Sequence, residues 1–285
     1  MTAARSLRET QAAFLDRVML TNGRDPGDDA LPMAPERLEV YRGMVLGGYQ
    51  MMLTFVFTES MRLLDHELAA TPAADGATGR ADLIARMVAT NPARTHSTRE
   101  IADRFLAFFP AAYPDLLARR PELPDLMQIE RAELQANYAD DDPGRAATEE
   151  DVQRLSSSDV EHFLATSVLR APSASLLFLV YPAATLQDEI RVRNFPKSPA
   201  PAAQTVAVSR APKTLQPVVR AHAEPGGSVL AALTSGEVAT VEVLAERWLQ
   251  TLPEAEAARG EEALFRMFGD AVLRALGDGF LRLPE

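Results

Sequence analysis

A block of apolar residues at helical spacing runs from Glu36 to Leu64 and is the strongest pattern in the chain. Apolar side chains recur there three and four residues apart, which predicts one long amphipathic helix or two abutting helices. Pro35 precedes the block, at a position where helices commonly begin. An earlier segment has the same spacing and predicts a first helix, followed by a Gly- and Asp-rich loop to Pro35. Its periodic positions are Leu7, Gln11, Phe14, Leu15, Val18 and Met19.

Three further helices are predicted in the first half, over residues 81–89, 101–109 and 123–138. Asn91-Pro92 ends the first of them, and Pro110 and Pro114 bracket a turn around Tyr113. The run Ala139-Asp-Asp-Asp-Pro-Gly144 then interrupts the pattern, because three acids followed by Pro-Gly neither fit a core nor continue a helix. We expect a domain boundary there, followed by a helical link up to residue 165.

The second half changes to short β-prone runs. Residues 173–181 contain a continuous apolar run at 176–181, and residues 204–209 and 215–221 are predicted as strands. Helical patterns over 228–233, 238–249 and 254–276 follow, and a Gly-Asp-Gly turn leads to a closing strand at 280–283. The predicted fold is α+β, mainly α. It comprises an N-terminal helical domain over residues 1–140, a helical linker over 141–165, and a winged-helix-like α/β module over 166–285.

Composition and charge narrow the classes of function. The net charge of −11 disfavours non-specific attraction to nucleic-acid phosphates. The chain has no cysteine, which excludes disulfides, thiolate metal sites and a cysteine nucleophile. No run approaches the roughly 20 apolar residues of a membrane span, and the first residues do not resemble a signal peptide. We expect a soluble, cytoplasmic protein without membrane partners.

The residue types that usually carry catalysis form no recognisable constellation. The four histidines, His66, His96, His162 and His222, lie far apart, and no pair has metal-binding spacing. Ser156-Ser157-Ser158-Asp159 is typical of a helix N-cap, and neither Gly-Gly pair precedes the Lys-Ser/Thr of a phosphate loop. The sequence therefore predicts that the chain is not an enzyme and binds no cofactor.

Two sets of residues are candidates for binding. Arg37, Tyr41 and Arg42 open the long helical block, and Arg and Tyr are enriched at interface hot spots. The alternative is intramolecular, with Arg pairing to nearby acids and the Tyr ring packing. Val206, Val208 and Ser209 are the second set, as the edge of a strand that could capture an extended peptide. The helix around Trp248 carries Glu242 and Glu246, which opposes phosphate contact, and Trp248 itself is expected in the core.

Several motifs resemble a bacterial family that is labelled as a DNA-binding domain and is otherwise of unassigned function. The resemblance covers about residues 7–140. Its motifs are Arg37-Leu-Glu-Val-Tyr-Arg-Gly43, Phe55-Val-Phe-Thr58, Arg62-Leu-Leu64, Asn91-Pro92 to Ser97, Phe105-Leu-Ala-Phe-Phe109 and Leu123-Pro-Asp-Leu-Met-Gln-Ile-Glu130. Thr58 stands where the family commonly has proline. The last motif brings Glu130 into the set of expected partner contacts, beside Arg37, Tyr41 and Arg42.

The resemblance implies a non-catalytic role. Members of the family, including the accessory subunit of methanobactin biosynthesis, bind a TIM-barrel iron enzyme that modifies cysteines of a ribosomally synthesised peptide. By this resemblance, the iron would belong to the partner, and the C-terminal module would help to engage the precursor peptide. The alternative is a DNA-binding transcriptional regulator, as the family label states.

Overall fold

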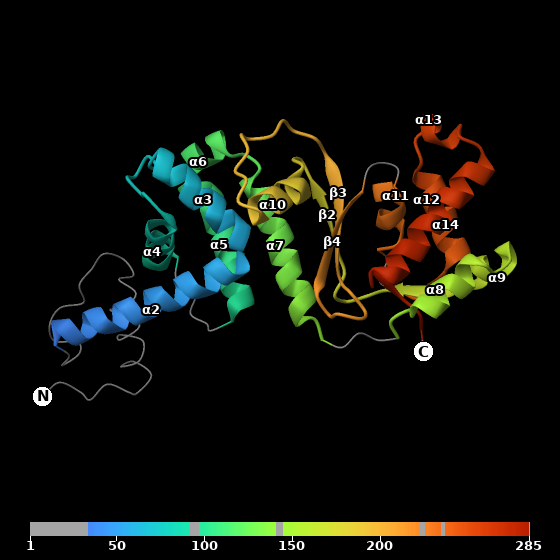
Figure 1. Cartoon of the computed structure of the whole chain (residues 1–285), viewed down its shortest axis with the longest axis horizontal. Coiled ribbons are helices and arrows are strands. Elements are labelled where there is room, and N and C mark those ends of the chain that lie inside the picture. The colour runs from blue at the N-terminus through green and yellow to red at the C-terminus, as the bar shows by residue number, and fades with distance from the viewer. Residues whose placement is uncertain (1–33, 92–96, 141–144, 223–225, 235–236, 285) are drawn as a thin grey trace, which may run out of the picture. The chain divides into compact units, whose positions relative to one another are not determined.

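The computed structural model describes residues 34–91, 97–140, 145–222, 226–234 and 237–284 (Figure 1). The predicted first helix, over Leu7 to Met19, lies outside these residues. The chain divides into two compact units, and the division falls between Pro124 and Asp125. The described residues form a mainly helical α+β protein, as the sequence predicts.

The described residues of the first unit form helices and connecting loops, without a strand. Its helices are α2 (Pro35–Val56), α3 (Thr58–Ala70), α4 (Arg80–Thr90), α5 (Thr98–Ala112) and α6 (Pro114–Arg119). The strongest sequence block is thus two abutting helices, α2 and α3, which meet at Phe57. The chain breaks there without a proline at position 58, which is Thr58. The predicted break around Tyr113 separates α5 from α6, although α5 continues through Pro110 to Ala112.

A row of aromatic rings runs through the core of the first unit. Phe57 at the α2–α3 joint lies 5.6 Å from Phe105 between ring centroids, and Phe109 lies 5.8 Å from Phe105. Tyr113, at the end of α5, lies 5.7 Å from Phe109. All four side chains are almost fully buried. The joint between α2 and α3 is therefore fixed by core packing around Phe57.

The second unit contains the remaining helices and all strands of the described residues. Its helices are α7 (Leu123–Tyr138), α8 (Glu149–Ser156), α9 (Val160–Ala165), α10 (Ala183–Arg191), α11 (Gly226–Ala232), α12 (Val241–Thr251), α13 (Glu254–Ala257) and α14 (Glu261–Gly277). Its strands are β1 (Ser167–Arg170), β2 (Ser175–Leu179), β3 (Gln204–Arg210), β4 (Pro217–His222), β5 (Ala239–Thr240) and β6 (Leu281–Arg282).

The strands form two antiparallel three-stranded sheets, with orders β5-β1-β6 and β2-β3-β4. In the larger sheet, Leu177 pairs with Val206 and Val208 pairs with Val219. The sequence predicts β2, β3, β4 and the closing strand β6. It misses β1, which joins the two-residue strands β5 and β6 from distant parts of the chain. It also misses α10.

The predicted helical linker belongs to the core of the second unit. Leu155 in α8 and Phe163 in α9 pack in the same apolar cluster as Trp248, Phe268 and Val272. Trp248 stacks on Phe268 with centroids 5.5 Å apart, which confirms its predicted core position. Residues 149–165 therefore form two short helices of the folded second unit and not a separate linker. Their apolar faces pack on the core of that unit.

The division of the chain also falls earlier than the predicted break at residues 139–144. The contacts of α7 explain the difference. The Asp125 carboxylate accepts hydrogen bonds from the backbone N–H groups of Val180 and Tyr181, at 2.8 and 2.9 Å. Glu133 accepts from Gln187 at 2.7 Å and pairs with Arg191 at 3.0 Å. These polar contacts attach α7 to the strand β2 and helix α10 region of the second unit.

Candidate binding surfaces

Helix α2 carries two apolar faces, of which the first unit buries only one. Leu38, Tyr49, Leu53 and Val56 are at most 6% exposed. On another side of the helix, Val40, Met44, Met51 and Phe55 are 63–71% exposed. A helix that is apolar on several sides is usually covered on several sides. We call these four exposed residues the α2 stripe.

The residues predicted to contact a partner differ in exposure and in pairing. Three of them lie on α2, and the fourth lies on α7. Arg37 and Tyr41 are exposed, and their four-residue separation places them on neighbouring turns of the same helix face. Arg42 forms an ion pair with Glu39 of the same helix, at 2.5 Å. This contact is the intramolecular pairing that the sequence offered as the alternative to a partner contact. Glu130 in α7 is 2% exposed, so its side chain is not presented on the surface of the second unit.

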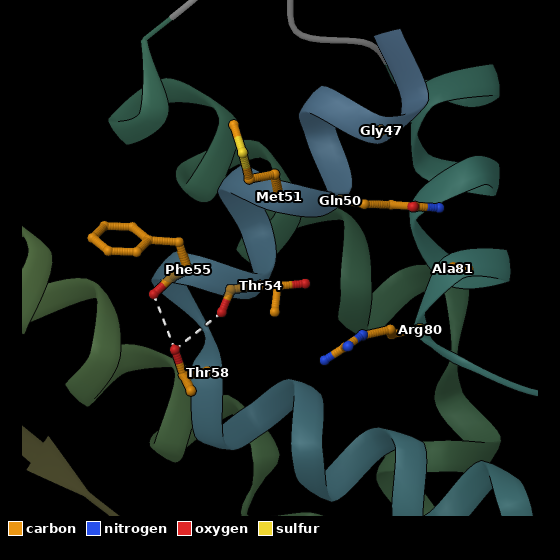
Figure 2. Close-up of a pocket in the computed structure, with 8 residues that line it drawn as sticks. All are labelled: Gly47, Gln50, Met51, Thr54, Phe55, Thr58, Arg80 and Ala81. Atoms are coloured by element: carbon orange, nitrogen blue, oxygen red, sulfur yellow. Dashed lines mark hydrogen bonds between the residues drawn. The ribbon is translucent and has the colours of Figure 1, made fainter. Parts of the chain in front are cut away.

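A hollow of about 500 Å³ lies beside the C-terminal half of α2. Figure 2 shows Met51 and Phe55 projecting from one side of the helix, while Gln50 extends toward α4. Arg80, at the start of α4, pairs with Asp65 at 3.4 Å. Thr58 donates hydrogen bonds to the carbonyls of Thr54 and Phe55, at 3.0 and 3.1 Å. These polar groups around the hollow thus bind protein atoms, which leaves an apolar wall suited to an apolar side chain.

The predicted peptide-binding strand is not an edge strand. β3 pairs with β2 on one side and with β4 on the other, so its backbone groups are used within the sheet. Val206, Val208 and Ser209 are buried, and the Ser209 hydroxyl donates to the Asp278 carbonyl at 2.8 Å. The prediction was wrong because a strand with both neighbours present has no free backbone edge to offer a peptide. The edges of this sheet belong to β2 and β4.

A second hollow of about 500 Å³ lies between the edge strand β2 and helices α11 and α12. Phe178 of β2 is 68% exposed and lines it, together with Ala231 and Ala232 of α11. Arg247 and Thr251 of α12 form the polar side. Among the described residues, no acidic side chain forms an ion pair with Arg247. This β2–α11–α12 hollow combines an apolar wall, a cation and a strand edge.

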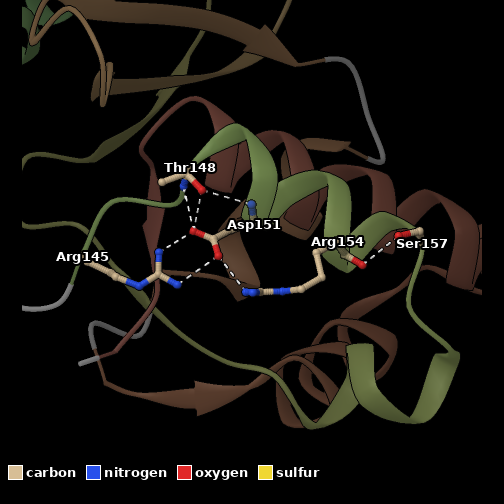
Figure 3. Close-up of polar contacts among 5 residues, drawn as sticks. All are labelled: Arg145, Thr148, Asp151, Arg154 and Ser157. Atoms are coloured by element: carbon tan, nitrogen blue, oxygen red, sulfur yellow. Dashed lines mark hydrogen bonds and ion pairs between the residues drawn. The ribbon is translucent and has the colours of Figure 1, made fainter.

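A polar cluster around Asp151 in the second unit has a structural role. Asp151 accepts from the backbone N–H and the hydroxyl of Thr148 at 3.0 and 2.9 Å, and completes a capping box at the start of α8. Arg145 and Arg154 pair with the same carboxylate (Figure 3). The hydrogen bond from Arg145 and that from the Thr148 backbone hold the pKa of Asp151 well below its ordinary value. A carboxylate so fully paired is a poor acid or base at neutral pH.

Tyr113 and His222 have shifted pKa values for physical reasons that suggest no catalysis. Burial, and then the negative charge of Asp75, raise the pKa of Tyr113 to about 12, and the Arg86 guanidinium lies 5.2 Å from its ring centroid. Burial and the nearby Arg274 charge lower the pKa of His222. His66 and His162 lie on exposed helix surfaces or ends, and His96 falls outside the described residues.

The described residues contain neither a metal-binding cluster nor a membrane-spanning helix. No group of three or more His, Asp or Glu side chains among them has the arrangement needed to hold a metal ion. None of the helices formed by these residues combines the length and apolarity needed to cross a bilayer.

No family model and no curated protein matches this chain. The family resemblance therefore depends on the sequence motifs alone. The surfaces described above are independent of it, because they follow from burial and strand order.

The sequence pattern did not identify the β2–α11–α12 hollow. Phe178 lies at least 50 positions before the other lining residues in the sequence, and folding alone brings it near Arg247. One signal was present in the sequence. Side chains alternate between the two faces of a strand, so a strand over this apolar run places Phe178 and Val180 on one face and Leu179 on the other. Leu179 is buried, and Phe178 and Val180 are exposed.

Proposed function

We propose that this chain is a non-catalytic accessory subunit that recruits a ribosomally synthesised peptide to a TIM-barrel iron enzyme. The observation that carries the peptide-binding part is the β2–α11–α12 hollow, where an apolar wall and a cation adjoin an edge strand. The family motifs around Arg37 and Glu130 support the enzyme partner. The iron and its ligands would be supplied by that partner.

The chemistry of the hollow favours a particular kind of peptide segment. An extended segment can add to the edge strand β2 through main-chain hydrogen bonds, and alternate side chains then enter the hollow. Phe178 and the alanines of α11 favour an aromatic or aliphatic side chain. Arg247 favours a carboxylate, which a guanidinium binds with two parallel hydrogen bonds. We therefore expect the bound segment to carry an apolar and an acidic residue.

The enzyme contact is proposed for the exposed surface of α2. Arg37 and Tyr41 are the members of the predicted set whose side chains are exposed. Buried Glu130 is not retained as a contact residue. Replacing Arg37 by Glu should weaken the enzyme complex by reversing the charge at an interface position.

The alternative proposal is that the second unit has a winged-helix-like arrangement and that the chain binds DNA. Helix α12 is the predicted groove-binding helix, and its Glu242 and Glu246 oppose the DNA backbone because both are exposed. A gel-shift titration at low and physiological salt distinguishes the two proposals. Sequence-specific binding that persists at physiological salt would favour the regulator.

Co-expression with a TIM-barrel iron enzyme, to be sought among the neighbouring genes, tests the leading proposal. We expect the two chains to copurify and coelute. Peptide recruitment is tested by fluorescence anisotropy with the precursor peptide, where Arg247→Glu and Phe178→Ser should each weaken binding at least about tenfold. Arg266→Glu is the matched control, because Arg266 is an exposed helix residue paired with Glu262 at 3.0 Å. Equal affinity of all variants would place the peptide elsewhere.

A further inference from the structure

The α2 stripe lacks a cover among the described residues of the first unit. Its four side chains are each more than 60% exposed, whereas the opposite apolar side of the same helix is almost fully buried. Val40, Met44, Met51 and Phe55 follow one another at spacings of four, seven and four residues, so they form one continuous line along the helix. A line of large exposed apolar side chains is typical of a surface that another helix covers.

The spacing of the stripe reads the same in both directions along the helix. Its midpoint falls on a pair of glycines, with Met44 and Met51 at equal distances on either side and Val40 and Phe55 at equal larger distances. A surface with this symmetry can pair with a copy of itself about a twofold axis. An antiparallel pair centred on the glycines places Met44 of each copy opposite Met51 of the other, and Val40 of each opposite Phe55 of the other.

The two glycines at the midpoint, Gly47 and Gly48, suit the crossing point of two helices. A Cβ added at either position would meet no atom of the surrounding packing within 4 Å, so the packing of the described residues does not call for glycine there. Glycine in a helix interior is less stable than alanine. At a helix crossing, however, it lets the two backbones approach closely, so that the larger flanking side chains meet.

The charges of α2 favour an antiparallel pair over a parallel one. Its N-terminal part carries Glu36, Arg37, Glu39 and Arg42, whereas residues 43–58 include no charged residue. An antiparallel pair places the charged end of each copy opposite the uncharged end of the other. A parallel pair would set Arg37 against Arg37 and Glu36 against Glu36, and like charges in contact oppose association.

The hollow beside the C-terminal half of α2 adjoins the same surface. Met51 and Phe55 line it and project from one side of the helix (Figure 2). In the antiparallel register, Met44 and Val40 of the second copy face these two residues. The hollow of about 500 Å³ has room for apolar side chains of this size. Because each copy has such a hollow, a twofold pairing covers both in the same way.

We propose that two copies of the chain associate through their α2 stripes about a twofold axis, with the two helices antiparallel and crossing at Gly47 and Gly48. Four side chains per copy cover less than the roughly 800 Å² per partner of a standard stable interface, so we expect a weak dimer that forms at micromolar concentration. Dimerisation is a property of the free chain and does not depend on the accessory function. Arg37 lies seven residues before Met44, on the same side of the helix, so an enzyme bound at Arg37 would displace the second copy.

Sedimentation velocity of the full-length chain at concentrations from about 1 to about 300 μM tests the association. The chain should convert from monomer to dimer as its concentration rises. Met44→Lys/Met51→Lys places charges at the centre of the contact and should weaken the dimer at least about tenfold. Leu249→Lys is the matched control, because Leu249 is an exposed apolar residue of helix α12, and it should leave the dimer unchanged. All three positions are exposed, so each variant should fold, which circular dichroism checks.

Disulfide trapping between single-cysteine variants tests the register, because the chain has no native cysteine. In the proposed pair Met44 faces Met51, whereas the two copies of Met44 lie seven residues apart along the helices, about 10 Å. That separation is too long for a disulfide. A mixture of Met44→Cys and a size-tagged Met51→Cys should therefore yield the mixed disulfide-linked dimer in at least about tenfold excess over either self-linked dimer.

Three results would overturn the proposal. A chain that stays monomeric over the whole concentration range would assign the stripe to another protein or to another segment of the chain. A dimer that withstands Met44→Lys/Met51→Lys would place the interface elsewhere. Preferential self-linking of Met44→Cys would show a parallel pair, in conflict with the twofold antiparallel contact.

Discussion

Asp151 shows how one buried side chain can connect a helix start to its surroundings. Its carboxylate accepts from Thr148 and pairs with Arg145 and Arg154, although both arginines are about half exposed or more. Hydrogen bonds to the charged carboxylate stabilise it over the neutral acid, which is why its pKa is lowered.

We predict that Asp151→Asn lowers the free energy of unfolding at pH 7 by about 1–2 kcal/mol, since a helix cap and charged pairs are weakened. The folded pKa lies below the unfolded one. The stabilisation is therefore complete above the ordinary value of 3.8 and is lost as the pH falls through and below it. Urea unfolding at pH 7, 4 and 3 should show that the free energy of unfolding falls less on acidification in the variant than in the unmodified protein.

Glu149→Gln is the control for this series. Glu149 pairs with Lys213, but both side chains are at least 75% exposed, so little change in stability is expected. An unchanged acid dependence in Asp151→Asn would mean that the pairing of Asp151 does not stabilise the fold.

Gly279 occupies a position that no other residue fits without movement. Its φ is +74°, and an added Cβ would lie 2.3 Å from the Arg210 carbonyl oxygen. We predict that Gly279→Ala destabilises the protein by about 2–4 kcal/mol through combined backbone strain and overpacking. Gly260→Ala should cost only about 1 kcal/mol, because φ is +89° there but the space is open. Thermal melts that rank the two variants equally would contradict the steric argument.

At the scale of elements, α6 is attached to the end of α3 by a buried ionic group. Arg120, whose side chain is 4% exposed, contacts Glu122 at 2.7 Å and Glu67 at 3.1 Å. Arg119 also donates to the Thr71 carbonyl at 2.9 Å. The loop after α3 and the end of α6 are thereby fixed together.

We predict that Arg120→Met destabilises the chain by about 3 kcal/mol, because it removes a buried guanidinium that pairs with the buried Glu122 carboxylate. The double variant Arg120→Met/Glu122→Gln should recover part of that loss. Arg104→Met, at an exposed pair with Glu100, should cost under about 1 kcal/mol. Chemical denaturation of the four proteins would test the order, and equal losses in Arg120→Met and Arg104→Met would refute it.

Elements with local signals were predictable from the sequence, and elements formed by distant contacts were not. The helical block of α2 and α3, the helix α7 and the strands β3 and β4 follow from apolar spacing and turn residues, whereas the joint between α2 and α3 does not. Strand β1 has only four residues and gains its partners from residues 239–240 and 281–282. The central position of β3 likewise depends on which strands flank it, which periodicity alone does not specify. Both hollows depend on the same long-range packing.

At the scale of the whole chain, the division in the first turn of α7 defines which fragment should fold. The second unit begins at Asp125, and the carboxylates of Asp125 and Glu133 receive four hydrogen bonds or ion pairs from residues 180–191. A fragment that starts at the apparent sequence break would lose all of them.

We predict that a fragment of residues 125–285 unfolds cooperatively, while a fragment of residues 141–285 is less stable by at least about 3 kcal/mol. Urea unfolding followed by circular dichroism measures both. Equal midpoints and slopes for the two fragments would show that α7 is dispensable to the second unit.

The central claim is that the chain recruits a peptide for another protein's chemistry. Mass spectrometry of the precursor peptide after incubation with the barrel enzyme tests it most directly. We predict a modified product with the enzyme and this chain together, at most a trace with the enzyme alone, none with this chain alone, and a reduced yield with Arg247→Glu. Equal modification by the enzyme with and without this chain would contradict the account.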